Sequence, residues 1–170
     1  MKKYVFKPYS PIFPELFQKE KNRIAPHLQH VFAIEHVGST AVPGLGGKGI
    51  IDLAIAVKKE DLETASQELQ TLGYEFRPTF STPDRLYFIH ELPDPEEDKR
   101  RYHVHLTYPE SSDWKGLISF RDYLRTHPET VQEYAELKKQ AALEADQKGD
   151  LYRKIKEPIF KKIDGLIHEP

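Results

Sequence analysis

The chain of 170 residues contains no cysteine, and this absence excludes several kinds of site. A disulfide framework, a thiol nucleophile and any zinc or iron–sulfur centre with cysteine ligands are ruled out. Basic residues are not in excess either, because the formal net charge is −2. Proteins that bind the phosphate backbone of nucleic acids usually carry a basic excess, so we expect no nucleic-acid partner.

Long hydrophobic runs are missing as well. The first residues, MKKYVFKPYSPIF, carry two lysines but no apolar stretch of signal-peptide length. Elsewhere no apolar run approaches the ~20 residues of a membrane-spanning helix. We therefore expect a cytoplasmic protein that contacts no membrane. The length suits a single domain over residues 1–170, because typical domains have about 100–150 residues.

Hydrophobic periodicity predicts the order helix, two strands, helix, three strands and three helices. The first helix falls within residues 11–29, where Pro26 is expected to kink or end it, and the second ends at Gly73. Segment 93–100, PDPEEDKR, is expected to be a solvated hairpin loop between the last two strands. This order is typical of an α+β fold, a small mixed sheet with flanking helices and a helical C-terminal segment.

The connection between the first two predicted strands is unusually long and rich in glycine. Its sequence is GSTAVPGLGGKG, residues 38–49. Glycine exposes backbone N–H groups and permits close approach of a ligand, which suits phosphate oxygens. Ser39 and Thr40 add hydroxyl donors, and Lys48 adds a positive charge. The spacing is not that of a Walker loop, and a tight turn without any ligand is the alternative.

Asp52 is the only charged residue in the strand that follows this glycine loop. Its carboxylate could hold a divalent cation that bridges to the phosphate, or it could cap a neighbouring backbone group. His103 and His105 lie two residues apart on a later strand, so they project from one face of the sheet. With Asp52 they could ligate Mg²⁺, Mn²⁺ or Zn²⁺, hydrogen-bond a phosphate, or provide a general base. Two histidines on a solvated or half-buried face are the alternative.

Other candidates lie near these residues. Arg85 opens the strand before the histidine strand and could bind an anionic group through two hydrogen bonds. Glu35 and His36 are neighbours on the first strand and face opposite sides, so at most one of them faces the ligand. Lys156 follows Tyr152 by about one helical turn, which lets both reach the same site.

The stretch HVGSTAVPGLGGKGIIDLAIAV is very similar to the signature of the GrpB (UPF0157) family. HVHLTYPESSDWKGLISFRDYLRTHPETVQEYAELKKQ resembles the second signature of that family, and the segment from Tyr152 to Lys156 resembles its Y-x-x-x-K motif. The resemblance extends over nearly the whole chain. It implies a single domain with a nucleotidyltransferase-like fold, related to the small domains of the polymerase β type.

The resemblance also implies roles for particular residues. In active nucleotidyltransferases a Gly-Ser pair binds the triphosphate. Two carboxylates two residues apart, usually with a third from a later strand, hold two magnesium ions. Gly38, Ser39 and Asp52 match this pattern, but Ala54 stands where the second carboxylate is expected. In the fold that the resemblance implies, His103 or His105 is expected at the place of the third carboxylate.

Three functions remain open as hypotheses. The first is a nucleotidyltransferase-like enzyme with Asp52 and His105 in catalytic roles. Its metal would lie on Asp52, His103 and His105, and its phosphate on Gly38, Ser39, Thr40, Lys48, Arg85 and Lys156. The second is a module that binds a nucleotide or phosphorylated metabolite without transfer. A coenzyme A precursor is one candidate ligand, because relatives in the family occur fused to dephospho-CoA kinases. The third is a metal-dependent hydrolase built on the histidine pair.

Overall fold

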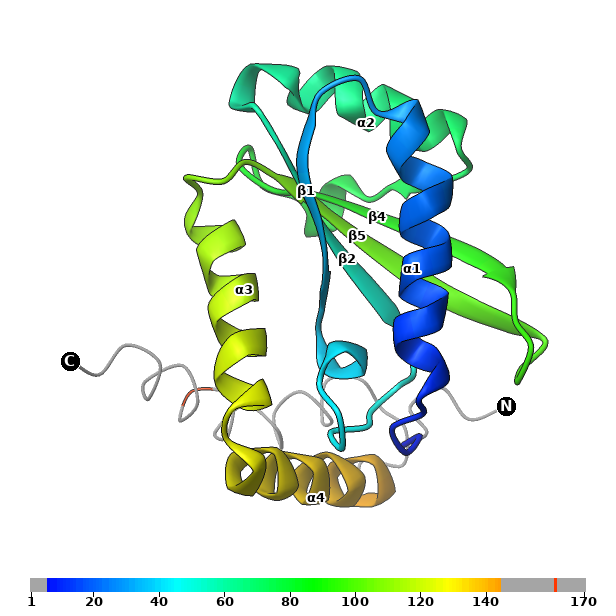
Figure 1. Cartoon of the computed structure of the whole chain (residues 1–170), viewed down its shortest axis with the longest axis vertical. Coiled ribbons are helices and arrows are strands. Elements are labelled where there is room, and N and C mark those ends of the chain that lie inside the picture. The colour runs from blue at the N-terminus through cyan, green and yellow to red at the C-terminus, as the bar shows by residue number, and fades with distance from the viewer. Residues whose placement is uncertain (1–5, 145–160, 162–170) are drawn as a thin grey trace.

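The computed structural model describes residues 6–144 and residue 161. Within them the chain forms four α-helices and a five-stranded mixed sheet (Figure 1). The helices are α1 Ile12–Ile24, α2 Leu62–Thr71, α3 Ser112–Arg125 and α4 Pro128–Glu144. The strands are β1 Val31–Val37, β2 Ile51–Val57, β3 Glu75–Phe76, β4 Leu86–Pro93 and β5 Lys99–Thr107. The predicted α+β fold and its element order are therefore confirmed, while the last predicted helix lies outside the described residues except for Lys161.

The sheet has the order β1-β2-β5-β4-β3. Strands β2 and β5 are parallel, and every other neighbouring pair is antiparallel. The parallel register places Asp52 beside His103 and Ala54 beside His105. Residues that face each other in neighbouring strands share one side of the sheet. The pairing of β2 with β5 therefore brings the predicted aspartate and histidines onto the same side.

Alternation along the strands gives the sheet two different faces. Leu53, Phe88 and Val104 are fully buried on one face, where α1 and α2 pack onto them. Residues three and four apart form the buried side of each of these helices: Phe13, Leu16, Glu20 and Ile24 in α1, and Leu62, Ala65 and Leu69 in α2. The opposite face carries Asp52, His103 and His105. The hydrophobic core thus lies on one side of the sheet and the candidate site on the other.

Local signals set the ends of several helices. Helix α1 ends at Ile24, and Pro26 lies in a short 3₁₀ turn directly after it, as expected. Gly73 follows α2 with φ +101°, a conformation that favours glycine at a helix end. Ser111 caps α3, where its hydroxyl accepts a hydrogen bond from the backbone N–H of Trp114 at 3.0 Å. None of the described helices is long and apolar enough to cross a membrane.

A second, smaller cluster of buried side chains connects the glycine loop to α3 and α4. Val42 and Leu45 of the loop pack with Leu124 of α3 and with Val131 and Tyr134 of α4. In Figure 1, α3 lies beside β1, and α4 crosses below the connection between β1 and β2. Helices α3 and α4 therefore cover one side of the glycine loop.

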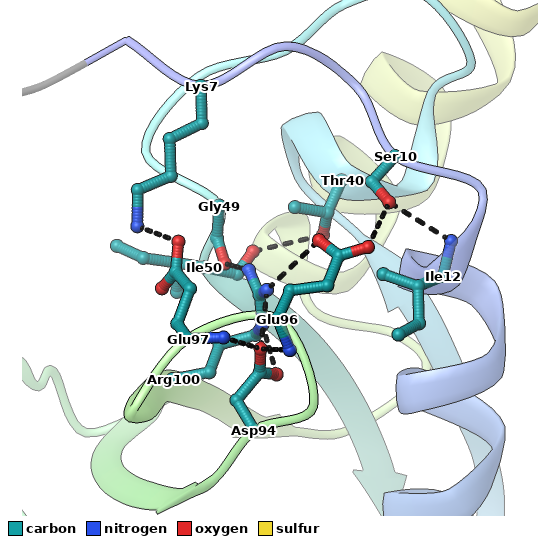
Figure 2. Close-up of polar contacts among 10 residues, drawn as sticks. All are labelled: Lys7, Ser10, Ile12, Thr40, Gly49, Ile50, Asp94, Glu96, Glu97 and Arg100. Atoms are coloured by element: carbon teal, nitrogen blue, oxygen red, sulfur yellow. Dashed lines mark hydrogen bonds and ion pairs between the residues drawn. The ribbon is translucent and has the colours of Figure 1, made fainter.

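The segment between β4 and β5 is a largely exposed hairpin loop, as its composition predicts, but two charged side chains at its ends depart from this prediction. The side chains of Asp94 and Arg100 are buried and form an ion pair with Nε and Oδ1 2.6 Å apart. Arg100 also donates from Nη1 to the carbonyl oxygen of Gly49 at 2.7 Å. Because Arg100 satisfies Asp94 and the loop carbonyl together, the carboxylate is buried rather than left in water. The hairpin therefore holds one end of the glycine loop (Figure 2).

The N-terminal segment adds a second attachment to the glycine loop. Lys7 and Gly47 exchange backbone hydrogen bonds of 2.6 and 2.9 Å. The ammonium of Lys7 pairs with the carboxylate of Glu97, and the hydroxyl of Ser10 donates to Glu96 at 3.1 Å (Figure 2). These contacts tie the loop, the first residues and the hairpin into one network.

Candidate functional site

A cavity of about 620 Å³ lies between the second face of the sheet, the glycine loop, α3 and α4. Its volume falls within the range of ~300–1,000 Å³ that is usual for sites of small-molecule ligands. Most of the predicted site residues line it: Gly38, Ser39, Lys48, Asp52, Arg85, His103 and His105. The structure thus gathers residues from the loop, from β2, from β5 and from the start of β4 around one space.

Gly38 and Asp52 are in close contact at the base of the loop. Gly38 has φ +76°, a left-handed conformation that side chains other than glycine rarely adopt. A Cβ atom at this position would lie 2.5 Å from Oδ2 of Asp52. Both the backbone and the space therefore require glycine here, and the carboxylate of Asp52 is fixed directly beneath the start of the loop.

A hydrogen-bonded chain connects Arg85, His105 and Asp52. Nη1 of Arg85 lies 3.2 Å from Nδ1 of His105, and a guanidinium can only donate, so Nδ1 is the acceptor. The proton of the ring is then on Nε2, which donates to Oδ1 of Asp52 at 3.2 Å. Burial raises the pKa of Asp52, but the hydrogen bond from His105 and the surrounding imidazoles outweigh it and lower the pKa overall. Asp52 is therefore an ionised carboxylate at neutral pH.

His103 is the second imidazole beside Asp52. Its Nδ1 lies 3.6 Å from Oδ1 of Asp52 and 2.5 Å from the hydroxyl oxygen of Tyr87. Its Nε2 is buried and has no hydrogen-bond partner among the described residues. Burial lowers the pKa of His103 to about 4, against the effect of Asp52, so the ring is neutral at pH 7. Asp52 and both histidines thus converge, as the shared-site hypothesis requires.

This convergence does not by itself make a metal site. Within the described part of the chain, no group of three histidine, cysteine, aspartate or glutamate side chains is arranged to hold an ion. One nitrogen of His105 carries a proton towards Asp52, and the other accepts from Arg85, so neither presents a lone pair to a metal. In this arrangement the side chains of Asp52, His103 and His105 do not fit a divalent cation. Binding of a cation to them stays a prediction.

Ala54 occupies the position of the second carboxylate, and its neighbours in the sheet are His105 on β5 and Glu35 on β1. Glu35 is therefore on the same face as the site, but its Oε2 accepts from Nη1 of Arg121 in α3 at 2.9 Å. His36 faces the other side, where its ring stacks on Phe17 with centroids 4.7 Å apart. Glu35 and His36 face opposite sides of the sheet, as predicted. The carboxylate of Glu35 is bound by α3.

Lys138 of α4 is a site residue that sequence reasoning missed. It is only 5% exposed and lines the cavity, and its Nζ donates to the carbonyl oxygen of Gly46 at 3.2 Å. A Cβ atom at Gly47 would lie 2.7 Å from Nζ of Lys138 and 3.0 Å from Oγ of Ser39. The ammonium and the hydroxyl therefore both lie close to a position where only glycine leaves room.

A signal for Lys138 was present in the sequence. The other buried residues of α4 are Thr130, Val131, Tyr134 and Ala141, and Lys138 falls on the same side of the helix. A lysine on the apolar side of a helix is rarely fully buried without a specific role for its charge. Periodicity could therefore have identified Lys138 as unusual, although not as a neighbour of Ser39.

Two predicted ligand-binding residues have a different outcome. Thr40 is buried and does not line the cavity, because its hydroxyl donates to the carbonyl oxygen of Ile50 at 2.9 Å and contacts Nε2 of His36 at 2.9 Å. Its role in the structure is to hold the loop rather than to face a ligand. Lys156, with Tyr152, lies outside the described residues.

Comparison with known proteins adds a family-level finding. A family model described as "GrpB protein" matches residues 3–165. A UPF0157 protein of Pseudomonas aeruginosa is 34% identical over 160 residues, which cover 93% of this chain and 65% of that protein. UPF0157 protein YqkA of Bacillus subtilis is 34% identical over 136 residues, which cover 79% of this chain and 38% of YqkA. The matched region thus spans less than two thirds of the length of either relative.

Two further matches concern a solved structure and a longer protein. The crystal structure of the conserved protein GrpB from Enterococcus faecalis is similar with a TM-score of 0.75 and 29% identity. That match covers 93% of this chain and 98% of the GrpB chain. A protein described as a dephospho-CoA kinase, from Mycolicibacterium paratuberculosis, is 28% identical over 91% of this chain and 43% of its own length.

Proposed function

The chain belongs to the GrpB protein family, and from that premise we propose that its cavity binds a phosphorylated small molecule, with a nucleotide as the favoured class. The observation that carries this proposal is that Nζ of Lys138 and Oγ of Ser39 both lie close to Gly47 while both residues line the cavity. An ammonium and a hydroxyl beside a bare backbone form a set of donors that suits phosphate oxygens. The phosphate is assigned to this part of the cavity.

The charges in the cavity support that placement. Lys48 lines the cavity from the same loop, and Arg85 lines it from the start of β4. Asp52 is an ionised carboxylate, so a phosphate placed directly against it is repelled unless a cation lies between them. The side of the cavity with Ser39 and Lys138 is therefore the more favourable place for an anion. Solvent has little access to that side of the cavity, so water screens the attraction between the anion and the ammonium less.

Nucleotidyl transfer is the second candidate function. It is favoured by the pair Gly38 and Ser39, which follows β1, and by Asp52 of β2, which lies against Gly38 and lines the cavity. This combination matches the pattern of active nucleotidyltransferases that the family resembles. Those enzymes use a further carboxylate at the position of Ala54 to hold two metal ions. An ion on Asp52, His103 and His105 would first require His105 to release Asp52. For this reason binding without transfer is the main proposal. A metal-dependent hydrolase would also require His105 to release Asp52.

Calorimetric titration of the purified chain tests the proposal. We would titrate pyrophosphate, AMP, ATP and dephospho-CoA, the last because of the relative described as a dephospho-CoA kinase. Each titration is done first with a chelator and then with Mg²⁺. We expect binding in the presence of the chelator and a loss of affinity of about tenfold or more in Lys138→Gln, because a charged hydrogen bond is lost.

The matched control is Lys139→Gln, since Lys139 is the next residue of α4 and is exposed. It should bind as the unmodified chain does, and thermal melting should show that both variants are folded. Failure of all four compounds to bind, or equal affinities in the two variants, would contradict the proposal. Binding that needs Mg²⁺ and disappears in Asp52→Asn would instead favour nucleotidyl transfer.

A further inference from the structure

Gly116 is an unusual residue for the middle of α3. Glycine is the least favourable helix residue after proline, and Gly116 lies in the interior of this helix. The backbone does not require glycine here, because Gly116 is not among the glycines with a positive φ. Packing does not require it either. A Cβ atom there would have no atom of the described residues within 4 Å, apart from its own helix backbone and chain neighbours. Gly116 is exposed and lines the cavity, so the open space is at the mouth of the candidate site.

One part of the cavity wall formed by the helices is apolar. Leu117 and Phe120 of α3 line it together with Tyr134 of α4. The rings of Phe120 and Tyr134 meet edge to face, with centroids 6.2 Å apart and planes at 73°. Aromatic rings prefer offset-stacked or edge-to-face contact with other planar rings. Leu117, Phe120 and Tyr134 thus form an apolar aromatic part of the cavity wall, beside the polar Asp113 of α3 and Lys138 of α4.

The spacing along α3 places Gly116 between a polar and an aromatic residue of the cavity wall. Asp113, Gly116 and Phe120 lie three and four residues apart, so they follow one another along the same side of the helix. Asp113 pairs with Arg85 at 3.5 Å on the polar side, and Phe120 belongs to the aromatic surface. Gly116 is between them. A bare helix backbone at this point lets a flat group lie close to α3.

We infer that the ligand carries a planar ring such as a nucleobase, and that the ring lies over Gly116 against Leu117 and Phe120. This inference rests on the proposed function, which supplies the phosphate end of the ligand. The size of the cavity agrees with it, because about 620 Å³ is far more than a phosphate needs. A water molecule accounts for about 30 Å³ of the liquid, and a phosphate is only a few times larger. Gly116 is thereby a specificity-determining residue for the ring.

Calorimetry with ring-containing and ring-free phosphates tests the inference on the full chain. The probes are AMP, CMP, GMP and UMP, with ribose 5-phosphate and pyrophosphate as ligands without a base. We expect at least one nucleotide to bind about tenfold tighter than ribose 5-phosphate, the usual scale of one stacked base. Gly116→Leu should remove this difference and leave the affinity for ribose 5-phosphate unchanged, since the leucine would fill the place of the ring.

Lys115→Leu is the matched control, because Lys115 is exposed and is not among the described residues that line the cavity. It should keep the preference for the nucleotide. Gly116→Ala, which favours the helix, provides a second variant and should weaken nucleotide binding in the same direction. Equal binding of all phosphates by the unmodified chain, or a preference that survives in Gly116→Leu, would overturn the ring assignment alone. Failure of every phosphate to bind would overturn the proposed function, and the ring assignment with it.

Discussion

His105 donates from Nε2 to Oδ1 of Asp52 across 3.2 Å, and Arg85 determines the direction of that bond by donating to the opposite ring nitrogen. The carboxylate of Asp52 is thereby held by β5 and by the residue that precedes β4. It is a fixed anion in the wall of the cavity rather than a mobile side chain. The behaviour of the site towards ions, protons and substitutions follows from this arrangement.

The first prediction concerns divalent metals. With both nitrogens of His105 engaged, we expect Mg²⁺, Mn²⁺ and Zn²⁺ alone to leave the melting temperature unchanged. Differential scanning fluorimetry of the unmodified chain and of Asp52→Asn measures this. A metal-dependent rise in melting temperature that is absent in Asp52→Asn and His105→Gln would instead establish the metal on Asp52, His103 and His105.

The second prediction is that Gly38 cannot be replaced without loss of stability. Gly38→Ala should lower the free energy of unfolding by about 2–4 kcal/mol, since it combines backbone strain with a collision at Oδ2 of Asp52. Gly44→Ala is the control, because Gly44 also has a positive φ of +85° but its nearest atom, on Val131, is 3.8 Å away. Urea denaturation should show a loss of only about 1–2 kcal/mol for that control.

A double variant separates the two causes at Gly38. Removal of the carboxylate in Gly38→Ala/Asp52→Ala relieves the 2.5 Å contact with Oδ2, but neither the 3.1 Å contact with Cβ of residue 52 nor the strained φ. We expect the alanine at residue 38 to be less destabilising in that background than in the unmodified chain. Equal losses for Gly38→Ala and Gly44→Ala would show that contact with Asp52 does not matter.

The third prediction concerns pH. Burial lowers the pKa of both His36 and His103 from 6.5 to about 4. Between these values the unfolded chain binds protons that the folded chain does not, so the free energy of unfolding falls as the pH is lowered from about 6.5 to about 4. Each ring should contribute on the order of 2–3 kcal/mol to this fall. The lowered pKa of Asp52 adds a further loss below its ordinary 3.8.

Urea denaturation at several pH values between 7.5 and 4.5 measures that dependence. His103→Gln should reduce the fall in stability by about half, because one of the two buried rings no longer titrates. His30→Gln is the control, since His30 is exposed. A pH dependence that is the same in His103→Gln as in the unmodified chain would contradict the burial of this ring in its neutral form.

The fourth prediction concerns the buried ion pair that holds the glycine loop. Asp94→Asn removes the nearest charged partner of the buried Arg100 guanidinium and leaves only the more distant Glu96, 3.9 Å away, as an ion-pair partner, so the free energy of unfolding should fall by about 3 kcal/mol. Asp98→Asn changes an exposed carboxylate of the same hairpin and should have an effect within about 0.5 kcal/mol. Chemical denaturation of both variants checks the difference, and equal stabilities would refute it.

Local periodicity determined which face of each element carries which residues. Asp52 alternates with Ile51 and Leu53, so the sequence placed its carboxylate on the side of β2 away from the core. The same rule placed His103 and His105 together on one face. These predictions depend only on neighbours along the chain, and they agree with the structure for that reason.

Packing between distant segments of the chain decided which residues meet on these faces. Asp52 and His105 are 53 positions apart, and they meet because β5 pairs in parallel with β2. Lys138 and Gly46 are 92 positions apart, and their contact depends on how α4 crosses the glycine loop.

The prediction of a solvated hairpin is wrong for Asp94 for a related reason. Asp94 is expected in water by its residue type, and only the guanidinium of Arg100 makes its burial favourable. The sequence by itself thus determined the elements, their faces and the glycine loop. The tertiary structure decided which charges meet across the cavity, because strand pairing and helix packing depend on the whole chain at once.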